Sequence, residues 1–279
     1  MVSRSSRRVA ALTVGATVLA ASLGYAQFIY RGGGGFRGWP PKWATAAHFD
    51  GSFNYCRAYY TSNRREAGGS GADTDYPAAD NNFSVRLGEL TKVHVKMDAK
   101  GQPEHVVVRL TDPLLFSCPM IYMEDVGTAR FDEDEVEQLR AYLLKGGFLE
   151  VDDFWGKRAW DQWAREIGRV LPPDEYPIFD ITPDHAVMRM MYQLKGIAQV
   201  PSIQQWRRMG GGTSERWDSP YPNFRGIADE HGRLMVAMLH DTDIPDTWER
   251  EGESAEYFAR FSPDGYAIGI NIVLYAMTH

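Results

Sequence analysis

Two adjacent carboxylates, Asp152 and Asp153, directly follow the apolar run 148–151, which has the composition of a buried strand. Neighbouring carboxylates can bind a divalent cation, or raise one another's pKa and so serve in acid–base chemistry. The structural alternative is that Asp153 caps the next helix while Asp152 accepts hydrogen bonds from loop amides. The sequence leaves both interpretations open.

The densest polar cluster follows a second apolar run, 234–239, and comprises His240, Asp241, Asp243, Asp246, Trp248 and Glu249. Imidazole and carboxylate groups are common metal ligands, and a tryptophan can stack on a sugar or a peptide group. Their spacing matches no established metal motif. An acidic loop ordered by its own hydrogen bonds is the alternative.

Two further candidates are Asp75, which precedes Tyr76-Pro77, and His185, which follows Asp184. The first segment is typical of a turn with Asp80 as the cap of the next helix, and a ligand role for Asp75 is the alternative. His185 is either a site residue or an interior histidine satisfied by the backbone. No nucleophile elbow, phosphate loop or dinucleotide fingerprint occurs in the chain, so we expect no cofactor.

Strands and helices alternate along the chain, and the runs 53–60, 93–97, 106–110, 120–123, 148–151 and 234–239 have strand character. Helices are expected after Asp80, from the capping box Asp132/Glu135 to Gly146-Gly147, over 157–170 and over 267–277. Such alternation predicts an α/β fold with a mainly parallel sheet covered on both faces. Ligands of these folds gather beyond the carboxyl ends of the strands. We therefore expect Asp152-Asp153 and residues 240–243 to open into one crevice.

The chain begins with a basic stretch, an uncharged apolar run over 9–23 and the small residues of Gly24-Tyr25-Ala26. These are the parts of a cleavable export signal, residues 1–26, which the general secretory or the twin-arginine route could read. An uncleaved anchor is the alternative. A flexible lead-in over 27–47 and a single α/β domain over 48–279 follow, and we expect this domain to be periplasmic or secreted.

Composition restricts the partners. Removing residues 1–26 takes away three arginines and no acidic residue, so the net charge falls from −7 to −10. A surface this acidic argues against nucleic acid or anionic lipid as a partner. No second long apolar run exists, so we expect no transmembrane helix after signal cleavage.

The chain has two cysteines, Cys56 and Cys118. They could form a disulfide in an oxidising compartment, or pack separately in the core as small apolar side chains.

Four segments resemble the bacterial domain-of-unknown-function family 4159 over roughly residues 50–278: Asp75-Tyr76-Pro77, residues 119–123, residues 143–154 with Gly-Gly-Phe-Leu-Glu-Val-Asp-Asp, and residues 269–277. The stretch from His240-Asp241 to Trp248-Glu249 also fits. The resemblance implies a flavodoxin-like three-layer α/β/α sandwich of the class I glutamine amidotransferase-like group. The catalytic cysteine of that group would lie in the turn 151–154, which contains none, so the resemblance implies no glutaminase activity and no other reaction.

Three functional hypotheses follow. The first is an exported, non-glutaminase domain that binds a ligand or an envelope partner, with Asp152, Asp153, His240 and Asp243 lining the crevice. The second is a metal- or carboxylate-dependent hydrolase of envelope carbohydrate or peptide, with some of the eight tryptophans as a stacking platform. The third is an assembly module of an envelope complex.

Overall fold

A computed structural model describes residues 39–66, 69 and 71–279 of the chain. The predicted export signal and the lead-in up to residue 38 lie outside the described residues. Residues 39–47, the last part of the predicted lead-in, contact the sheet, because Trp43 forms a parallel bridge with Val107. A short 3-10 helix, η1 (Ala46–His48), follows.

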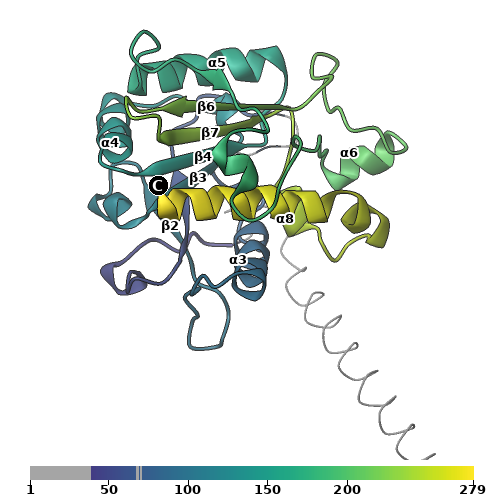
Figure 1. The fold of residues 1–279 in the computed structure, drawn as a ribbon, viewed down its shortest axis with the longest axis horizontal. Coiled ribbons are helices and arrows are strands. Elements are labelled where there is room, and N and C mark those ends of the chain that lie inside the picture. The colour runs from purple at the N-terminus through teal and green to yellow at the C-terminus, as the bar shows by residue number, and fades with distance from the viewer. Residues whose placement is uncertain (1–38, 67–68, 70) are drawn as a thin grey trace, which may run out of the picture.

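The described chain forms one open sheet of seven strands, shown in Figure 1. In spatial order they are β2 (His105–Arg109), β1 (Tyr55–Tyr59), β3 (Met120–Glu124), β4 (Phe148–Asp152), β7 (Leu234–His240), β6 (Asn223–Ala228) and β5 (Phe179–Asp180). The pairs from β2 to β7 are parallel, whereas β6 is antiparallel to both of its neighbours. The predicted α/β class is confirmed, and the sheet is mostly parallel but mixed. The antiparallel pairs at one edge were not predicted.

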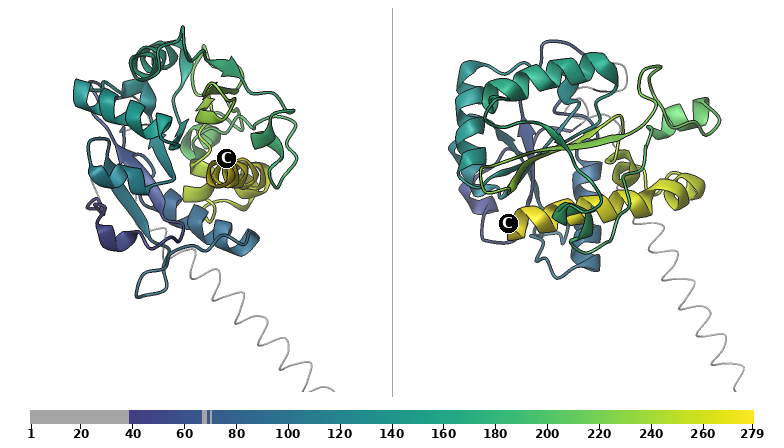
Figure 2. Two further views of the ribbon diagram at one scale, coloured as in Figure 1. Left: turned by 60° about the vertical axis from the view of Figure 1, so that its left-hand side comes forward. Right: turned by 45° about the horizontal axis from the view of Figure 1, so that its top comes forward.

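Helices cover both faces of the sheet, as the views in Figures 1 and 2 show. The helices are α3 (Ala78–Leu90), α4 (Glu133–Leu144), α5 (Gly156–Val170), α6 (Ile203–Arg208), α7 (Asp246–Glu249) and α8 (Ala255–Thr278). Three further 3-10 helices are η2 (Pro113–Ser117), η3 (Val126–Thr128) and η4 (Ala186–Arg189). The helices α4 and α5 pack on one face, and α3 and α8 pack on the other.

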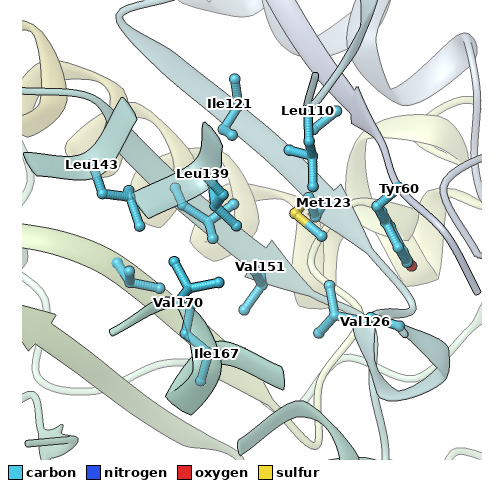
Figure 3. Close-up of a cluster of buried hydrophobic side chains, with 14 of the residues drawn as sticks. Tyr60, Leu110, Ile121, Met123, Val126, Leu139, Leu143, Val151, Ile167 and Val170 are labelled. Atoms are coloured by element: carbon cyan, nitrogen blue, oxygen red, sulfur yellow. The ribbon is translucent and has the colours of Figure 1, made fainter. Parts of the chain in front are cut away.

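The core follows from the alternation of side chains along each strand. Val151 of β4 packs with Leu139 of α4 and Ile167 of α5, in the cluster drawn in Figure 3. Phe148 of the same strand faces α3 and α8. Glu150 shares the face of Phe148, so the alternation places a carboxyl group inside the core.

The capping box predicted for the helix now labelled α4 is confirmed. The backbone N–H of Glu135 donates to Asp132 Oδ1 (2.8 Å), and the N–H of Asp132 donates to Glu135 Oε2 (3.0 Å). Gly146 follows the helix with φ +102°, a left-handed conformation that costs glycine little.

Asp80 does not cap the helix that it was expected to cap. It lies inside α3, whose N-cap is Pro77, and both of its oxygens accept hydrogen bonds from Arg57. Both side chains of this ion pair are fully buried. A guanidinium in the core needs a carboxylate partner, and this demand outweighs the preference of aspartate for helix caps.

Residues 93–97 do not form a strand of the sheet, although their pattern predicted one. They make only isolated bridges, of which Val95 to Phe53 is one. The free edge of β2 is occupied instead by residues 42–44, whose backbone exchanges two hydrogen bonds with Val107. The last helix is also longer than its prediction, because α8 begins after the N-cap Ser254.

Cys56 of β1 and Cys118, which precedes β3, are joined in a disulfide with their Cα atoms 6.1 Å apart. Both residues are buried. In the part of the chain that the structure describes, every helix is too short or too polar to cross a membrane.

Candidate functional site

Three neighbouring parallel strands each end in an aspartate with a left-handed backbone. Asp125 follows β3 with φ 50°, Asp153 follows β4 with φ 52°, and Asp241 follows β7 with φ 62°. Asp75, with φ 56°, is the fourth non-glycine residue with positive φ in the described chain. Residues other than glycine rarely adopt this backbone conformation, and those that do are often found at functional sites. The left-handed aspartates therefore indicate a functional site at the carboxyl edge of the sheet.

A cavity of about 20 Å³ opens at this edge, and we call it the acidic pocket. Its acidic side chains are Glu66, Asp125, Asp153, Glu215 and Asp243. The other residues that line it are Gly69, Trp155, Ser202 and Arg216. Side chains that are far apart in the sequence thus meet where the parallel strands end, as the topology of such sheets favours.

Hydrogen bonds hold one oxygen of each strand-end carboxylate in place. Asp153 Oδ1 accepts from the indole N–H of Trp155 (3.0 Å), and Asp243 Oδ1 accepts from the backbone N–H of Asp246 (3.0 Å). Asp125 Oδ2 accepts from the N–H of Gly71 (2.8 Å).

Two loops complete the acidic pocket. Glu215 is held through Oε1, which accepts from the N–H of Ser202 (2.6 Å). Gly69 lies so close to Asp125 that a Cβ atom on it would be 2.4 Å from the carboxyl carbon. Any larger residue at position 69 would therefore displace the Asp125 side chain.

Burial and mutual repulsion raise the pKa values of the pocket carboxylates. Burial is the largest cause for Asp153, whose pKa is well above its ordinary value, and the charges of Asp75, Glu215 and Asp125 raise it further. Burial and the charge of Asp153 likewise hold the pKa of Asp243 well above its ordinary value. The pKa of Asp125 rises to about 7, mainly through burial. Burial and repulsion thus disfavour the ionised forms of these carboxyl groups in the absence of a bound positive charge.

A second group of carboxylates adjoins the acidic pocket, and we call Asp75, Asp246 and Glu249 the inner triad. One oxygen from each lies within 4.8 Å of the others. Arg250 forms ion pairs with Asp246 and Glu249. Burial is the largest cause that raises the pKa of Asp246 to about 7 and that of Glu249 to about 10, and the charge of Asp75 adds to both.

A buried arginine connects the segments that form this edge of the sheet. Arg57 is fully buried, ion pairs with Asp80 and Glu124, and donates from Nη1 to the carbonyl oxygen of Thr74 (2.8 Å). Glu124 and Thr74 each directly precede one of the left-handed aspartates. The guanidinium thus ties the end of β3 to the loop before α3.

Asp152 lies beneath the acidic pocket and does not line it. Its Oδ1 accepts from the backbone N–H groups of Asp153 (2.6 Å) and Ile244 (3.3 Å), as the structural alternative for this residue proposed. Asp153 does not cap α5. Asp241 does so instead, since its Oδ1 accepts from the N–H of Gly156 (2.7 Å), the first residue of the helix.

His240 also lies outside the acidic pocket. Its ring packs against Phe154 (4.8 Å between centroids) and Trp160 (5.2 Å), beside α5. Nε2 lies 3.2 Å from the carbonyl oxygen of Gly156, and burial lowers the pKa of the imidazole to about 4. We expected His240 and Asp153 to line one crevice, but the His240 ring lies beside α5 and does not line the acidic pocket.

Trp248 and His185 have structural roles: the first packs in the core, and the second caps a short helix. The Trp248 ring is buried against Phe83 (4.4 Å), and a Cβ atom on Gly269 of α8 would be 2.5 Å from it, so no sugar could stack there. His185 is the N-cap of η4, and its Nδ1 accepts from the N–H of Val187 (3.2 Å). This contact matches the backbone-satisfied interpretation of His185.

Sequence reasoning missed Glu66, Asp125, Glu215 and Arg216 of the acidic pocket. Asp125 could have been found, because it follows a predicted strand in the same way as Asp153. Glu66, Glu215 and Arg216 lie in loops whose position depends on the tertiary structure, so no local pattern indicates them.

Trp217 was also missed, and its side chain is 95% exposed next to the pocket residue Arg216. The turn that carries it is ordered, because the N–H of Arg216 donates to Ser219 Oγ (3.0 Å) and Gln199 donates to the Ser219 carbonyl (2.9 Å). A large ring that is held out in solvent is a common feature of ligand and partner surfaces.

Comparison with known proteins identifies a family for the chain but assigns it no reaction. None of the curated proteins matches the chain. The model of a family described as a domain of unknown function, DUF4159, matches residues 60–277. This match covers the sheet from the end of β1 onward and both of its helical layers, so the chain belongs to the DUF4159 family.

Proposed function

We propose that the chain is an exported ligand-binding domain whose acidic pocket takes a positively charged group. The observation that carries this proposal is the convergence of Asp125, Asp153 and Asp243 from three neighbouring strand ends on one cavity. Among the described residues that line that cavity, five carry carboxyl groups and one, Arg216, carries a guanidinium. A cavity lined mainly by carboxyl groups attracts positively charged groups.

Export is part of the proposal, with a periplasmic or secreted location. It is supported by the signal-like residues 1–26 and by the disulfide between Cys56 and Cys118, since disulfides persist mainly in oxidising compartments. Mass spectrometry of the protein recovered from the envelope fraction tests it. The expected product begins at Gln27, and a chain that keeps its first residues in the cytosol would contradict this part.

We further propose that the fold is of the class I glutamine amidotransferase-like, flavodoxin-like type. The support is a parallel central sheet between helical layers, with a left-handed residue directly after the central strand β4. On this fold the nucleophilic cysteine of that group would lie in the turn 151–154, which contains Asp153 and no cysteine. Carboxylate chemistry at this position fits ligand binding better than amide transfer.

Ligand binding is tested by thermal unfolding of the mature protein with lysine, arginine and divalent metal ions as probes. A ligand present at 100 times its Kd stabilises the folded state by about 2.7 kcal/mol. We expect at least one cation to raise the melting temperature, and Asp153→Asn to abolish the increase. No response to any cation, or an equal response in the variant, would contradict the proposal.

The second candidate is a hydrolase of envelope carbohydrate or peptide. It is favoured by the pKa of Asp125, which burial raises to about 7, and by that of Asp153, which burial holds well above its ordinary value, because a carboxyl group with a raised pKa can serve as a general acid. A screen of glycosidic, ester and amide substrates, with and without divalent metal ions, tests it. Turnover that Asp153→Asn removes would favour the hydrolase, and no turnover under either condition would leave the binding function.

A further inference from the structure

Three carboxyl groups outside the acidic pocket lie within metal-ligand distance of one another. They are those of the inner triad, Asp75 of the loop before α3 and Asp246 and Glu249 of α7, and one oxygen from each lies within 4.8 Å of the other two. At a cation–oxygen distance of about 2.4 Å, ligands on opposite sides of an ion are about 4.8 Å apart, so these three oxygens can share one cation. None of the three residues lines the acidic pocket.

Short-range structure holds the inner triad in place. Asp246 and Glu249 are three residues apart on α7 and therefore share one face of that helix. The backbone N–H of Ile203 donates to Asp246 Oδ2 (2.6 Å) and orients this side chain. Asn82 of α3 donates to the carbonyl oxygen of Trp248 (2.8 Å), so α3, which the Asp75 loop enters, is joined to α7.

Two oxygen atoms of the inner triad are buried and accept no hydrogen bond in the described chain. One is Oε2 of Glu249, a residue that is 6% exposed. The other is Asp75 Oδ2, which is likewise shielded from solvent. A buried carboxylate oxygen without a hydrogen-bond donor is costly, and a bound cation would compensate both atoms at once.

Arg250 supplies only part of the positive charge that the inner triad requires. Its Nε ion pairs with Glu249 Oε2 (2.5 Å) and with Asp246 Oδ1 (3.4 Å), and its Nη1 ion pairs with Glu253 (3.8 Å). Three ionised triad carboxylates and one guanidinium have a net charge of −3 + 1 = −2. A divalent cation would neutralise this charge.

A proton shared between carboxyl groups is the competing explanation. Burial and mutual repulsion raise the pKa of Asp246 to about 7 and that of Glu249 to about 10, so the triad holds protons when no cation is bound. A proton joins two oxygens at a time, whereas a divalent ion contacts an oxygen of all three side chains. The mutual closeness of the three oxygens therefore favours the ion.

We propose that Asp75, Asp246 and Glu249 bind one divalent cation of the kind that prefers oxygen ligands, Ca²⁺, Mg²⁺ or Mn²⁺. The triad offers no nitrogen or sulfur, the usual ligands of structural zinc. The site is separate from the acidic pocket and goes beyond the proposed function. The ion would tie the loop before α3 to α7, and it would offset the charge of Asp75 that acts on Asp153.

Calorimetric titration of the chelator-treated mature protein with each of the three ions separately tests the proposal. We expect at least one of them to bind, with one ion per chain. Asp75→Asn and Glu249→Gln should each weaken its binding at least about tenfold, because the number of charged ligands sets the affinity of such sites. Asparagine tolerates the left-handed backbone of Asp75, and glutamine keeps the shape of Glu249, so both variants should fold.

Each variant has a matched control. Asp153→Asn also replaces a left-handed aspartate, but one that lines the acidic pocket. Glu137→Gln makes the second exchange on the exposed side of α4. Both controls should keep the ion, with an affinity above that of the two triad variants. Circular dichroism of all four proteins verifies the fold.

The absence of saturable binding for all three ions, or triad variants that bind the ion as tightly as their controls, would overturn the proposal. Binding that Asp153→Asn removes and the triad variants keep would also overturn it, because the ion would then occupy the acidic pocket. Lysine and arginine decide the proposed function independently of the metal ions. The rise of the melting temperature that they cause should be lost in Asp153→Asn and kept in Asp75→Asn.

Discussion

Replacing Glu150 by glutamine should stabilise the protein, by an amount that grows with pH. Glu150 lies in the middle of the central strand β4, opposite Tyr122 of β3 and Ala237 of β7. It is 2% exposed, and its Oε1 has no hydrogen-bond partner in the described chain. Burial alone raises its pKa from 4.5 to about 8.

The size of the effect follows from proton linkage. Below pH 4.5 the carboxyl group of Glu150 is protonated in both the folded and the unfolded chain, so the wild type and the Glu150→Gln variant behave alike. Between pH 4.5 and 8 the unfolded chain releases the proton while the folded chain keeps it, so the wild-type protein loses stability as the pH rises. At 1.36 kcal/mol per pKa unit, the loss is about 3 kcal/mol at pH 7 and about 5 kcal/mol above pH 8.

The assay is urea unfolding of the wild type and Glu150→Gln from pH 4 to pH 9, with the disulfide intact. The difference in unfolding free energy between the two proteins should rise from near zero at pH 4 to its full value above pH 8. Glu137→Gln, on the exposed side of α4, is the matched control and should show no such rise. A difference that is independent of pH, or a variant that is less stable at pH 8, would refute the reasoning.

Arg57→Met should destabilise the folded state by about 3–5 kcal/mol in the same assay, because it leaves two buried carboxylates without their cation; a loss below about 1 kcal/mol would show that they are stable without it. Gly69→Ala should reduce the rise of the melting temperature that a bound cation causes, since its Cβ would displace the Asp125 carboxyl group, whereas Gly196→Ala, which has open space around it, should not. An equal rise in these two variants would contradict the close approach. Cys118→Ala opens a disulfide that spans 62 residues and should cost about 4 kcal/mol of unfolding free energy by loop entropy. An unfolding midpoint equal to that of the wild type would contradict this value.

The elements that local patterns govern could be predicted from the sequence. The capping box of Asp132 and Glu135 and the glycine at position 146 set the limits of α4 through contacts between near neighbours. Strand β4 and helix α5 follow from apolar periodicity. The rule that ligands gather at strand ends placed Asp153 and Asp243 at one edge of the sheet, and the structure has both around one cavity.

Predictions failed where a distant partner decides the role of a residue. Asp80 has the sequence context of a helix cap, but the buried Arg57, 23 residues away, takes both of its oxygens. His240 follows a strand as Asp153 does, yet its ring turns toward α5, because Phe154 and Trp160 offer it an aromatic environment. Strand-end position indicates the edge of the sheet and not the direction of a side chain.

The choice of aspartate at the left-handed positions carries information about charge. Asparagine and glycine adopt this backbone at least as readily as aspartate, so a purely conformational requirement would be met by either. Asp125 and Asp153 instead bring carboxyl groups into the cavity that Asp243 also lines, and burial and repulsion raise their pKa values. A residue that strains the backbone and also repels its neighbours is poorly explained by stability. This choice of residue supports the proposal that the carboxyl edge of the sheet takes up a positively charged group.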